Sequence, residues 1–246
     1  MERLFLSGGS LLFLNSISKP TILKAMKRFS LLFLMFLTGF YSSQVYAQLA
    51  VLRDSGTGIP ITVNPYREVK GSAYIQDFKQ GTLDLLDGRK VEGLQIALNG
   101  YEHTLEYKLE GNLYAYAADK LKGFSIQNEG GETLRFTSEY MVPTLSKKRF
   151  LQIVEEGKYT LLLHSYKIMV DDVAATYGAQ AAKAFQNQED YFIVKAGEIY
   201  LVKNKNKDLE EVFGQDYSKA MEIQKSQKLN LKNLSDLAVL VRTLNQ

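Results

Sequence analysis

His103 and His164 are the two imidazoles of the chain, which contains no cysteine. Zinc and similar metals bind mainly to imidazole and thiolate groups, often at spacings such as i, i+4. The two histidines are far apart in the sequence, so we predict no metal site. His164 has Leu162 and Tyr166 on the same face of a predicted strand, and we interpret it as a hydrogen-bonded core or pocket residue.

Catalysis by a nucleophile or by paired acids requires side chains that can reach one another. His164 and Ser165 are neighbours on a predicted strand, so their side chains point to opposite faces and cannot form a nucleophile–base pair. The acid pairs Glu155–Glu156 and Asp171–Asp172 fall at predicted strand ends, where we expect solvated turns. The sequence therefore predicts no catalytic residue.

Phosphate and cofactor binding also lack a signal. Gly56–Gly58 and Gly130–Gly131 are without the strand–loop–helix context and the lysine of a phosphate-binding loop. The basic clusters Lys147–Arg149 and Lys203–Lys207 are short, and we interpret them as solvated surface. We predict no cofactor.

The abundance of tyrosine is the one compositional bias that suggests a function. The chain has 15 Tyr and no Trp, and Tyr114 and Tyr116 are predicted on the outward register of a strand. Exposed tyrosine offers rigid amphipathic contact area to a protein partner or a glycan. The alternative is that these rings cover the sheet edge or the helices of the protein itself.

The N-terminal segment has the layout of a secretory signal peptide. Met26–Arg28 is basic, Phe29–Phe40 is almost continuously apolar, and Val45–Ala47 fits cleavage after Ala47. The apolar run is shorter than the roughly 20 residues of a membrane span. Residues 1–25 resemble an upstream extension with Met26 as the working start, or else belong to a long signal peptide.

Removal of residues 1–47 would give a mature periplasmic or extracellular chain without a membrane span. The full chain has 30 Lys and Arg against 27 Asp and Glu, and the removed segment holds five of the former and one of the latter. The mature chain is thus close to neutral, which gives no reason to expect nucleic acid as a partner.

The mature chain is expected to contain an N-terminal arm (48–71), an antiparallel β domain (72–203) and C-terminal helices of the same folding unit (204–246). Turn signals such as Asp87-Gly88 and Asn99-Gly100 separate short alternating runs, which is typical of a β-meander. Since every turn is short, strands that are adjacent in sequence are expected to pair.

Lys158–Val170 is the longest strand-like run, and both of its alternating faces are largely apolar. We expect this strand at the centre of a sheet, covered on both sides. Tyr191–Lys203 predicts a tight hairpin that is apolar on both faces too. We interpret the Ala-rich run Asp171–Asn187 as a short helix or a lobe over the sheet.

The apolar period changes from 2 to 3.6 near the C-terminus. This predicts helices over Lys207–Phe213, Ser218–Lys228 and Leu234–Leu244. The predicted fold class is therefore β-rich α+β, with an antiparallel meander sheet, open, strongly curved or half-barrel, and C-terminal helices packed on one face.

Two stretches carry a family resemblance, GTLDLLDGRKVEGLQIALNGYEHTLEYKLEGNLYAY and the later YFIVKAGEIYLVKNKNKDLEEVFG. With the final Leu-rich helix, they resemble a family of uncharacterised exported proteins of Gram-negative bacteria, over Gly71 to Asn245. The most family-like parts are Leu83–Gly93 and Lys207–Gly214. The resemblance implies export and no particular activity or site residue.

These observations predict a non-enzymatic binding or interaction module of the cell envelope, with an unknown protein or an apolar or glycan ligand as partner. One alternative is a hydrolase-like enzyme whose site is assembled from scattered Asp, Glu, Tyr and His. Another is a purely structural envelope component. A closed apolar cavity between sheet and helices would favour a ligand carrier, and acids that converge on His164 would favour an enzyme.

Overall fold

The computed structural model describes residues 66, 68–142, 145, 147–172, 182–203 and 206–246. The chain divides into two compact units, Met1–Val51 and Leu52–Gln246, and every described residue belongs to the second. The predicted signal peptide, the arm as far as residue 65, Gly56–Gly58 and Lys205 lie outside the described residues.

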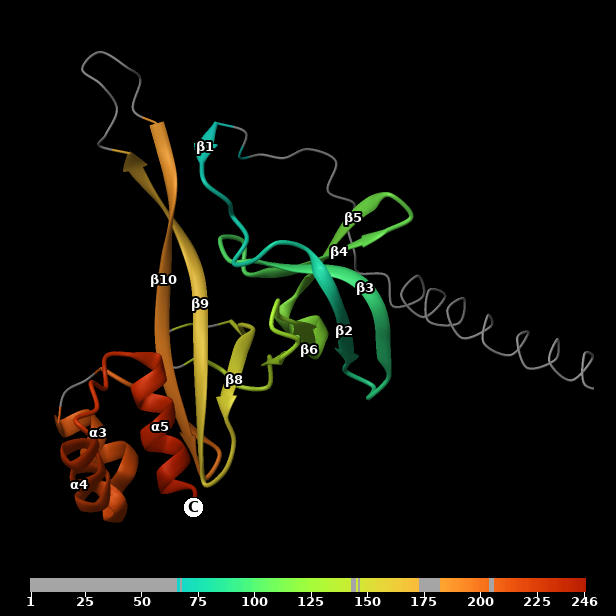
Figure 1. The fold of residues 1–246 in the computed structure, drawn as a ribbon. Helices are drawn as coiled ribbons and strands as arrows, with labels where there is room; N and C mark the ends of the chain where they lie inside the picture. The colour runs from blue at the N-terminus through green and yellow to red at the C-terminus, as the bar shows by residue number, and fades with distance from the viewer. Residues whose placement is uncertain (1–65, 67, 143–144, 146, 173–181, 204–205) are drawn as a thin grey trace, which may run out of the picture. The chain divides into compact units, whose positions relative to one another are not determined.

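The fold is β-rich α+β, as predicted: a mostly antiparallel sheet of 11 strands with C-terminal helices that contact it (Figure 1). Along the sheet the strand order is β1-β10-β9-β8-β7-β6-β2-β3-β4-β5, and β11 pairs with β10. The strands are β1 (Val69–Lys70), β2 (Lys79–Leu85), β3 (Lys90–Asn99), β4 (Thr104–Leu109), β5 (Asn112–Ala117), β6 (Leu121–Gln127), β7 (Thr133–Thr137), β8 (Leu151–Glu155), β9 (Tyr159–Asp172), β10 (Ala182–Lys195) and β11 (Glu198–Leu201). The helices are α3 (Asn206–Phe213), α4 (Tyr217–Gln227) and α5 (Leu234–Leu244), with 3-10 turns at Ala118–Lys120 (η1) and Gly214–Asp216 (η2).

The hairpin turns follow the predicted glycine chemistry. Gly88 and Gly111 have φ values of 85° and 80°, in the left-handed region that glycine adopts readily in hairpin turns. Gly93 has a φ of 75° and lies where the register of β2 and β3 shifts between Gly81 and Leu83. β3 therefore has a β-bulge at this point, and a glycine tolerates the left-handed backbone that it requires.

The prediction that all sequence neighbours pair is wrong at one place. After β5, the η1 turn redirects the chain, and β6 pairs with β2 and β7 instead of β5. β5 consequently forms one edge of the sheet, and β2 lies between β3 and β6. A second departure is β1, which pairs in parallel with β10 at Lys183 and Ala184.

The Ala-rich run is not a helix where the structure describes it. Asp171 and Asp172 are the last residues of β9, and residues 182–187 are the first part of β10. The two 14-residue strands pair over their full length, from Ala182 with Asp172 to Lys195 with Tyr159. The preference of alanine for a helix is weak, and the pairing of β10 with β9 overrides it here.

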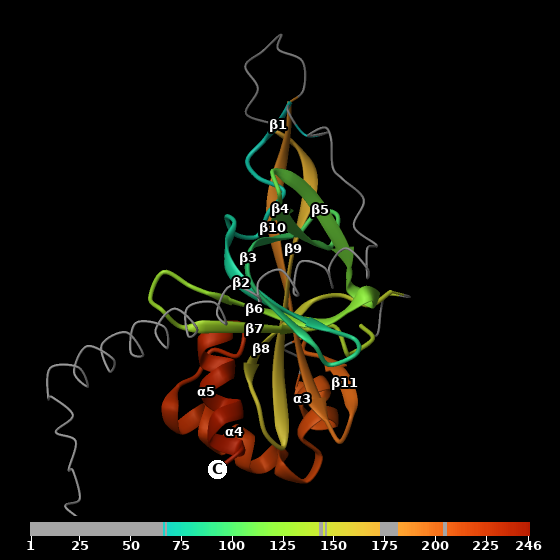
Figure 2. The ribbon, with the colours of Figure 1, turned by 90° about the vertical axis from the view of Figure 1, so that its right-hand side faces the viewer.

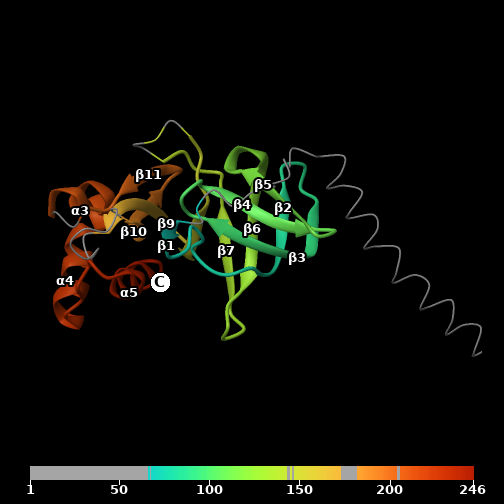
Figure 3. The same cartoon turned by 90° about the horizontal axis from the view of Figure 1, so that it is seen from above.

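β9 is covered on both faces over its first half, as predicted. Leu161 packs with Ile193 and with the helices, in a cluster that includes Leu209, Leu237 and Leu240. Leu162 packs on the other face, in a second cluster with Phe192, Val142 and Leu151. Figure 3 shows the helices beside the β9–β10 ribbon, on the side away from β2, β6 and β7, and Figure 2 shows them around the lower end of that ribbon. No helix of the described residues is long and apolar enough to cross a membrane.

Polar contacts join the last helix to the start of β9. The Asn245 side chain accepts a hydrogen bond from the Tyr159 backbone N–H at 2.9 Å and donates to the Tyr159 carbonyl at 2.8 Å. The Tyr159 hydroxyl donates to the Asp216 carboxylate at 2.8 Å, and burial raises the pKa of Tyr159 to about 12. α5 is therefore fixed to the sheet by both apolar packing and hydrogen bonds.

Candidate functional site

The strands β2, β3, β6 and β7 carry an open groove on one face of the sheet. Leu83 and Phe124 point to the opposite, buried face, so alternation places Thr82 and Ser125 on the groove face. Thr82 of β2 and Ser125 of β6 are direct partners across the two strands. Of the helices, α5 contacts β8 and β9, and the apolar cluster that the helices share with the sheet lies on β9 and β10.

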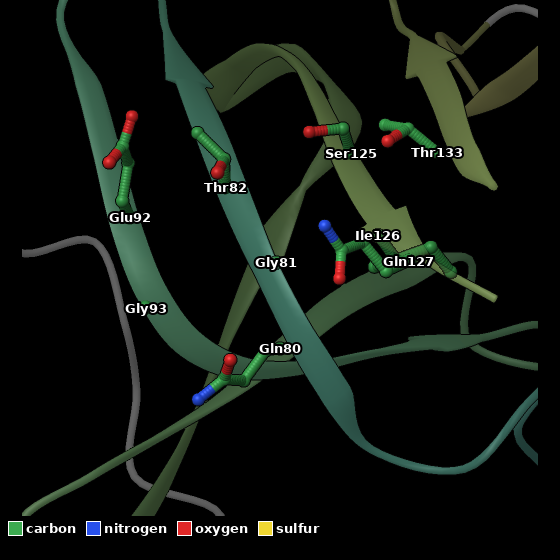
Figure 4. A pocket seen from close by; sticks show the side chains of 9 residues that line it. All are labelled: Gln80, Gly81, Thr82, Glu92, Gly93, Ser125, Ile126, Gln127 and Thr133. Carbon is green, nitrogen blue, oxygen red and sulfur yellow. The ribbon is translucent and has the colours of Figure 1, made fainter. Parts of the chain in front are cut away.

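One half of the groove is polar (Figure 4). It has a volume of about 330 Å³ and is lined by Gln80, Gly81, Thr82, Glu92, Gly93, Ser125, Ile126, Gln127 and Thr133. The side chains of Thr82, Ser125 and Thr133 come from three neighbouring strands. Amide, hydroxyl and carboxylate groups provide both donors and acceptors to a ligand in this half.

The other half has a charged rim. Its volume is about 500 Å³, and its lining residues include Ile153 of β8 and the charged residues Asp84, Lys90, Lys122, Arg135 and Glu139. Ser125 and Thr133 line both halves, so the two halves adjoin. The rim carries ion pairs of lysine or arginine with a carboxylate, namely Lys90–Asp84 at 3.4 Å, Lys122–Glu139 at 3.5 Å and Arg135–Glu156 at 2.6 Å.

Two glycines allow the strands to approach closely along the groove. A Cβ atom on Gly81 would lie 2.6 Å from the Ser125 carbonyl oxygen, and one on Gly123 would lie 2.2 Å from the Phe136 carbonyl oxygen. Real Cβ atoms essentially never come within 3.0 Å of another atom in this way. The sequence signal for both positions was a glycine within a strand, which often marks close approach of a second backbone.

The structure brings both histidines together, which the sequence did not predict. The ring of His103, in the β3–β4 turn, lies 5.8 Å from the ring of His164 on β9, and His164 stacks on Tyr166 at 4.8 Å. Asp190 is the register partner of His164 on β10, with Oδ2 4.0 Å from Nδ1. Within the described residues, no group of three or more His, Cys, Asp or Glu side chains could hold a metal ion.

His164 is buried, as predicted, but it is not hydrogen-bonded at Nδ1 in the described part of the chain. Burial lowers the pKa of His164 to about 4, with further contributions from His103 and Arg149. Burial and then Arg149 lower the pKa of His103 to about 4 as well, against a smaller opposite effect of Glu102. Both imidazoles are consequently neutral at neutral pH.

The turn that carries His103 is held against the edge of β9. The Lys167 N–H donates to the Gly100 carbonyl at 3.1 Å, while Tyr101 packs on Phe185 of β10 at 5.2 Å. The left-handed position of this turn falls on His103, with φ of 59°, and not on Gly100 as an Asn-Gly hairpin would have it. The reason is the length of the turn, since four residues separate β3 from β4.

A buried glutamate supports the same turn. Glu106 alternates with apolar residues of β4, a pattern that predicts an exposed side chain, yet it is 3% exposed. Its carboxylate accepts hydrogen bonds from the Asn99 side chain at 2.7 Å and the Tyr74 hydroxyl at 2.6 Å. Asn99 in turn accepts from the backbone N–H groups of Tyr101 and Glu102.

The acid pairs lie apart from one another, and Glu155, Glu156 and Asp172 are each ion-paired. Glu156 pairs with Arg135, Asp172 pairs with Lys70 at 3.3 Å, and Glu155 accepts a hydrogen bond from Arg242. Neither pair approaches His164 in the described interactions, and Ser165 points away from it because the two are sequence neighbours on β9. One acid, Asp190, faces His164.

Gly130 and Gly131 lie in the β6–β7 turn, where the Gly131 N–H donates to the Asn128 carbonyl. Lys147 and Lys203 are exposed, as expected of solvated clusters, whereas Arg149 is partly buried.

The prediction for the tyrosines is wrong for Tyr116. Its side chain is 2% exposed and stacks on Tyr107 at 5.2 Å, and Tyr107 stacks on half-buried Tyr114 at 5.3 Å. The three rings form a ladder across β4 and β5. The rings therefore cover the edge of the sheet, which was the alternative interpretation.

Comparison of the chain with protein-family models, with curated proteins and with solved structures gives no match.

Proposed function

We propose that the mature chain is an exported, non-enzymatic binding module of the bacterial cell envelope, and that its groove binds a glycan. Export is part of this proposal because the chain resembles a family of exported proteins. It also places the ligand on the face of the sheet that the helices leave open.

The observation that supports a glycan ligand is the lining of the polar half of the groove. Gln80, Thr82, Glu92, Ser125, Gln127 and Thr133 present amide, hydroxyl and carboxylate groups along neighbouring strands. Sugar hydroxyls are both donors and acceptors, so they suit a surface that has both. The open face of a sheet also accepts an extended ligand without a large conformational change.

A hydrolase is the weaker candidate. His164 and Asp190 come together, but 4.0 Å exceeds a hydrogen-bonding distance, and a single acid faces the imidazole. Paired acids for glycoside hydrolysis are about 5–9.5 Å apart across a cleft, whereas Glu156, Asp172 and Glu155 are engaged with Arg135, Lys70 and Arg242.

A bulky side chain at the centre of the groove should abolish glycan binding. We expect Ser125→Tyr to lower the affinity for the best ligand in a panel of neutral, N-acetylated and uronic-acid oligosaccharides by at least about tenfold, or about 1.4 kcal/mol. Ser125 lines both halves of the groove, and tyrosine favours strands, so the fold should persist. Isothermal titration calorimetry measures the effect.

Glu222→Tyr is the matched control, because Glu222 is exposed on α4, outside the groove. It should bind like the unmodified chain. The proposal is wrong if Ser125→Tyr binds as tightly as this control, or if no oligosaccharide of the panel binds the folded protein.

Export makes a separate prediction. When the full-length chain is expressed in a Gram-negative host, the protein recovered from the periplasm or medium should begin at Gln48, as determined by N-terminal sequencing. The reason is the Val45–Ala47 cleavage pattern that follows the apolar run. An uncleaved, membrane-bound product would contradict export.

A further inference from the structure

β5 (Asn112–Ala117) is an open edge of the sheet in the part of the chain that the structure describes. β4 pairs with one side of β5, and no described strand pairs with the other side. The strands that flank β10 at the opposite end of the sheet are shorter, with two residues in β1 and four in β11. Shortness is one way in which proteins protect a sheet edge, and the six residues of β5 do not provide it.

The residues of β5 also lack the other protections of an edge strand. The strand reads Asn-Leu-Tyr-Ala-Tyr-Ala, without a charged residue or a proline. Its register with β4 continues without a bulge over all six residues. Charges, prolines and bulges usually keep an edge strand from pairing with another chain, and tyrosine favours strands. β5 is therefore suited to pair with an additional strand.

The turn before β5 determines which backbone groups face outward. Glu110 and Gly111 have φ values of 51° and 80°, so both central residues of this two-residue turn are left-handed, as in type I′. The residues that flank such a turn, Leu109 and Asn112, form a hydrogen-bonded pair, and the two kinds of antiparallel pair alternate from there. Every second residue of β5, counted from Asn112, thus directs its N–H and C=O groups to β4.

The remaining residues, Leu113, Ala115 and Ala117, direct their backbone groups to the outer side of β5. These positions are symmetric about Ala115. When two copies of β5 pair antiparallel around a two-fold axis at Ala115, this residue lies opposite Ala115 of the second copy, and Leu113 lies opposite Ala117 of the second copy. Each outward-facing residue then meets an outward-facing residue, as a hydrogen-bonded ladder requires.

The side chains fit the same register. Tyr114 would lie opposite Tyr116 of the second copy in a non-hydrogen-bonded pair, where side chains come closest. Tyr107 of β4 and Tyr114 already stack at 5.3 Å, so the second copy would continue the tyrosine ladder across the axis. Aromatic pairs across neighbouring strands stabilise a sheet. Since β5 holds no charged residue, no like charges meet within the pair.

We propose that the chain forms a two-fold dimer in which the β5 strands of two copies pair antiparallel, with Ala115 at the axis. A second copy fits better than an unrelated peptide, because the same six residues supply both halves of the register. Main-chain hydrogen bonds provide most of the affinity of such strand addition. The contact is one strand wide, so the dimer is weak and concentration-dependent. The groove lies on other strands and is independent of this interface.

Cysteine cross-linking tests the register, because the chain has no cysteine of its own. Ala115→Cys should form an intermolecular disulfide in oxidised glutathione, since Cα atoms of a hydrogen-bonded antiparallel pair are about 5.5 Å apart, within the range of a disulfide. Ala117→Cys is the matched control. Ala117 is more exposed than Ala115, but in this register its two copies are offset by about 13 Å along the strands.

Non-reducing electrophoresis measures the fraction of cross-linked dimer. We expect a dimer for Ala115→Cys and little for Ala117→Cys. The proposal is overturned if Ala115→Cys gives no dimer, or if the more exposed Ala117→Cys gives as much.

Sedimentation equilibrium of the mature chain, at about 0.01–1 mM, measures the dimer without a cross-link. The unmodified chain should change from monomer to dimer over this range. Ala115→Lys should weaken the dimer at least about tenfold, because it places like charges opposite each other at the axis. Ala115→Pro should abolish the dimer and leave the β4–β5 pairing intact, because it removes an N–H that faces outward.

Melting curves show whether each variant is folded. An unmodified chain that stays monomeric at every concentration, including one that binds a foreign peptide through β5 instead, would overturn the proposal. A folded Ala115→Lys variant that dimerises as tightly as the unmodified chain would do so as well.

Discussion

Leu240→Asp should prevent the mature chain from folding cooperatively. Leu240 is fully buried between α5 and the sheet, in the cluster that contains Leu161, Ile193 and Leu237. The substitution removes about 1.5–3 kcal/mol of apolar burial and adds an unpaired charge that costs several kcal/mol more. Domains are stable by only about 5–15 kcal/mol, so little or no stability should remain. Circular dichroism melting and size-exclusion chromatography measure the loss.

Ser235→Asp on the same helix is the control, since Ser235 is exposed and a negative charge in the first turn of a helix is favourable. Deletion of Leu234–Gln246 should reproduce the effect of Leu240→Asp, because it also removes Leu237, Val241 and the Asn245 contacts with β9. A truncated chain that stayed monomeric with an unchanged melting curve would show that the helix is not part of the core.

Gly123→Ala should destabilise the protein by about 3 kcal/mol or more, the upper part of the range for overpacked sites. The new Cβ would lie 2.2 Å from the Phe136 carbonyl oxygen and 3.3 Å from the Thr137 Cα. Both atoms belong to the backbone of β7, so no side-chain rotation relieves the contact, and β6 and β7 must separate. Urea denaturation should show a lower midpoint.

Gly130→Ala provides the comparison within the same hairpin. Its Cβ would meet only the Asn128 side chain, at 3.4 Å, and its φ is not in the left-handed region. Its stability should change by less than about 1 kcal/mol, in either direction. Equal midpoints for the two variants would contradict the close crossing of β6 and β7 that forms the groove floor.

The helices and hairpins could be predicted because their signals are local. α5 has the predicted bounds, Leu234–Leu244, since its apolar stripe repeats with the helical period. The turns at Gly88 and Gly111 follow from residues that tolerate a left-handed backbone. Two-sided apolar alternation likewise identified β9 as a strand inside the sheet.

The groove and the histidine cluster depend on contacts between distant segments. Thr82 meets Ser125 only because β2, which pairs with its sequence neighbour β3 on one edge, pairs with the distant strand β6 on the other. His103 meets His164 because the β3–β4 turn reaches the edge of β9. Alternation also failed for Glu106, which Tyr74 and Asn99 bury, and for Tyr116, which stacks on Tyr107 on the opposite face of the same strands. Period-2 patterns place a side chain on one face of a strand without saying what covers that face.

Backbone amide NMR of the mature chain, titrated with the oligosaccharide that binds best, tests glycan binding by the groove most directly. We expect saturable shift changes at Thr82, Ser125, Gln127 and Thr133, which line the polar half of the groove, with little change along α4 and β5. Shift changes centred on the helices, or on the Tyr107–Tyr114 ladder at the sheet edge, would contradict it.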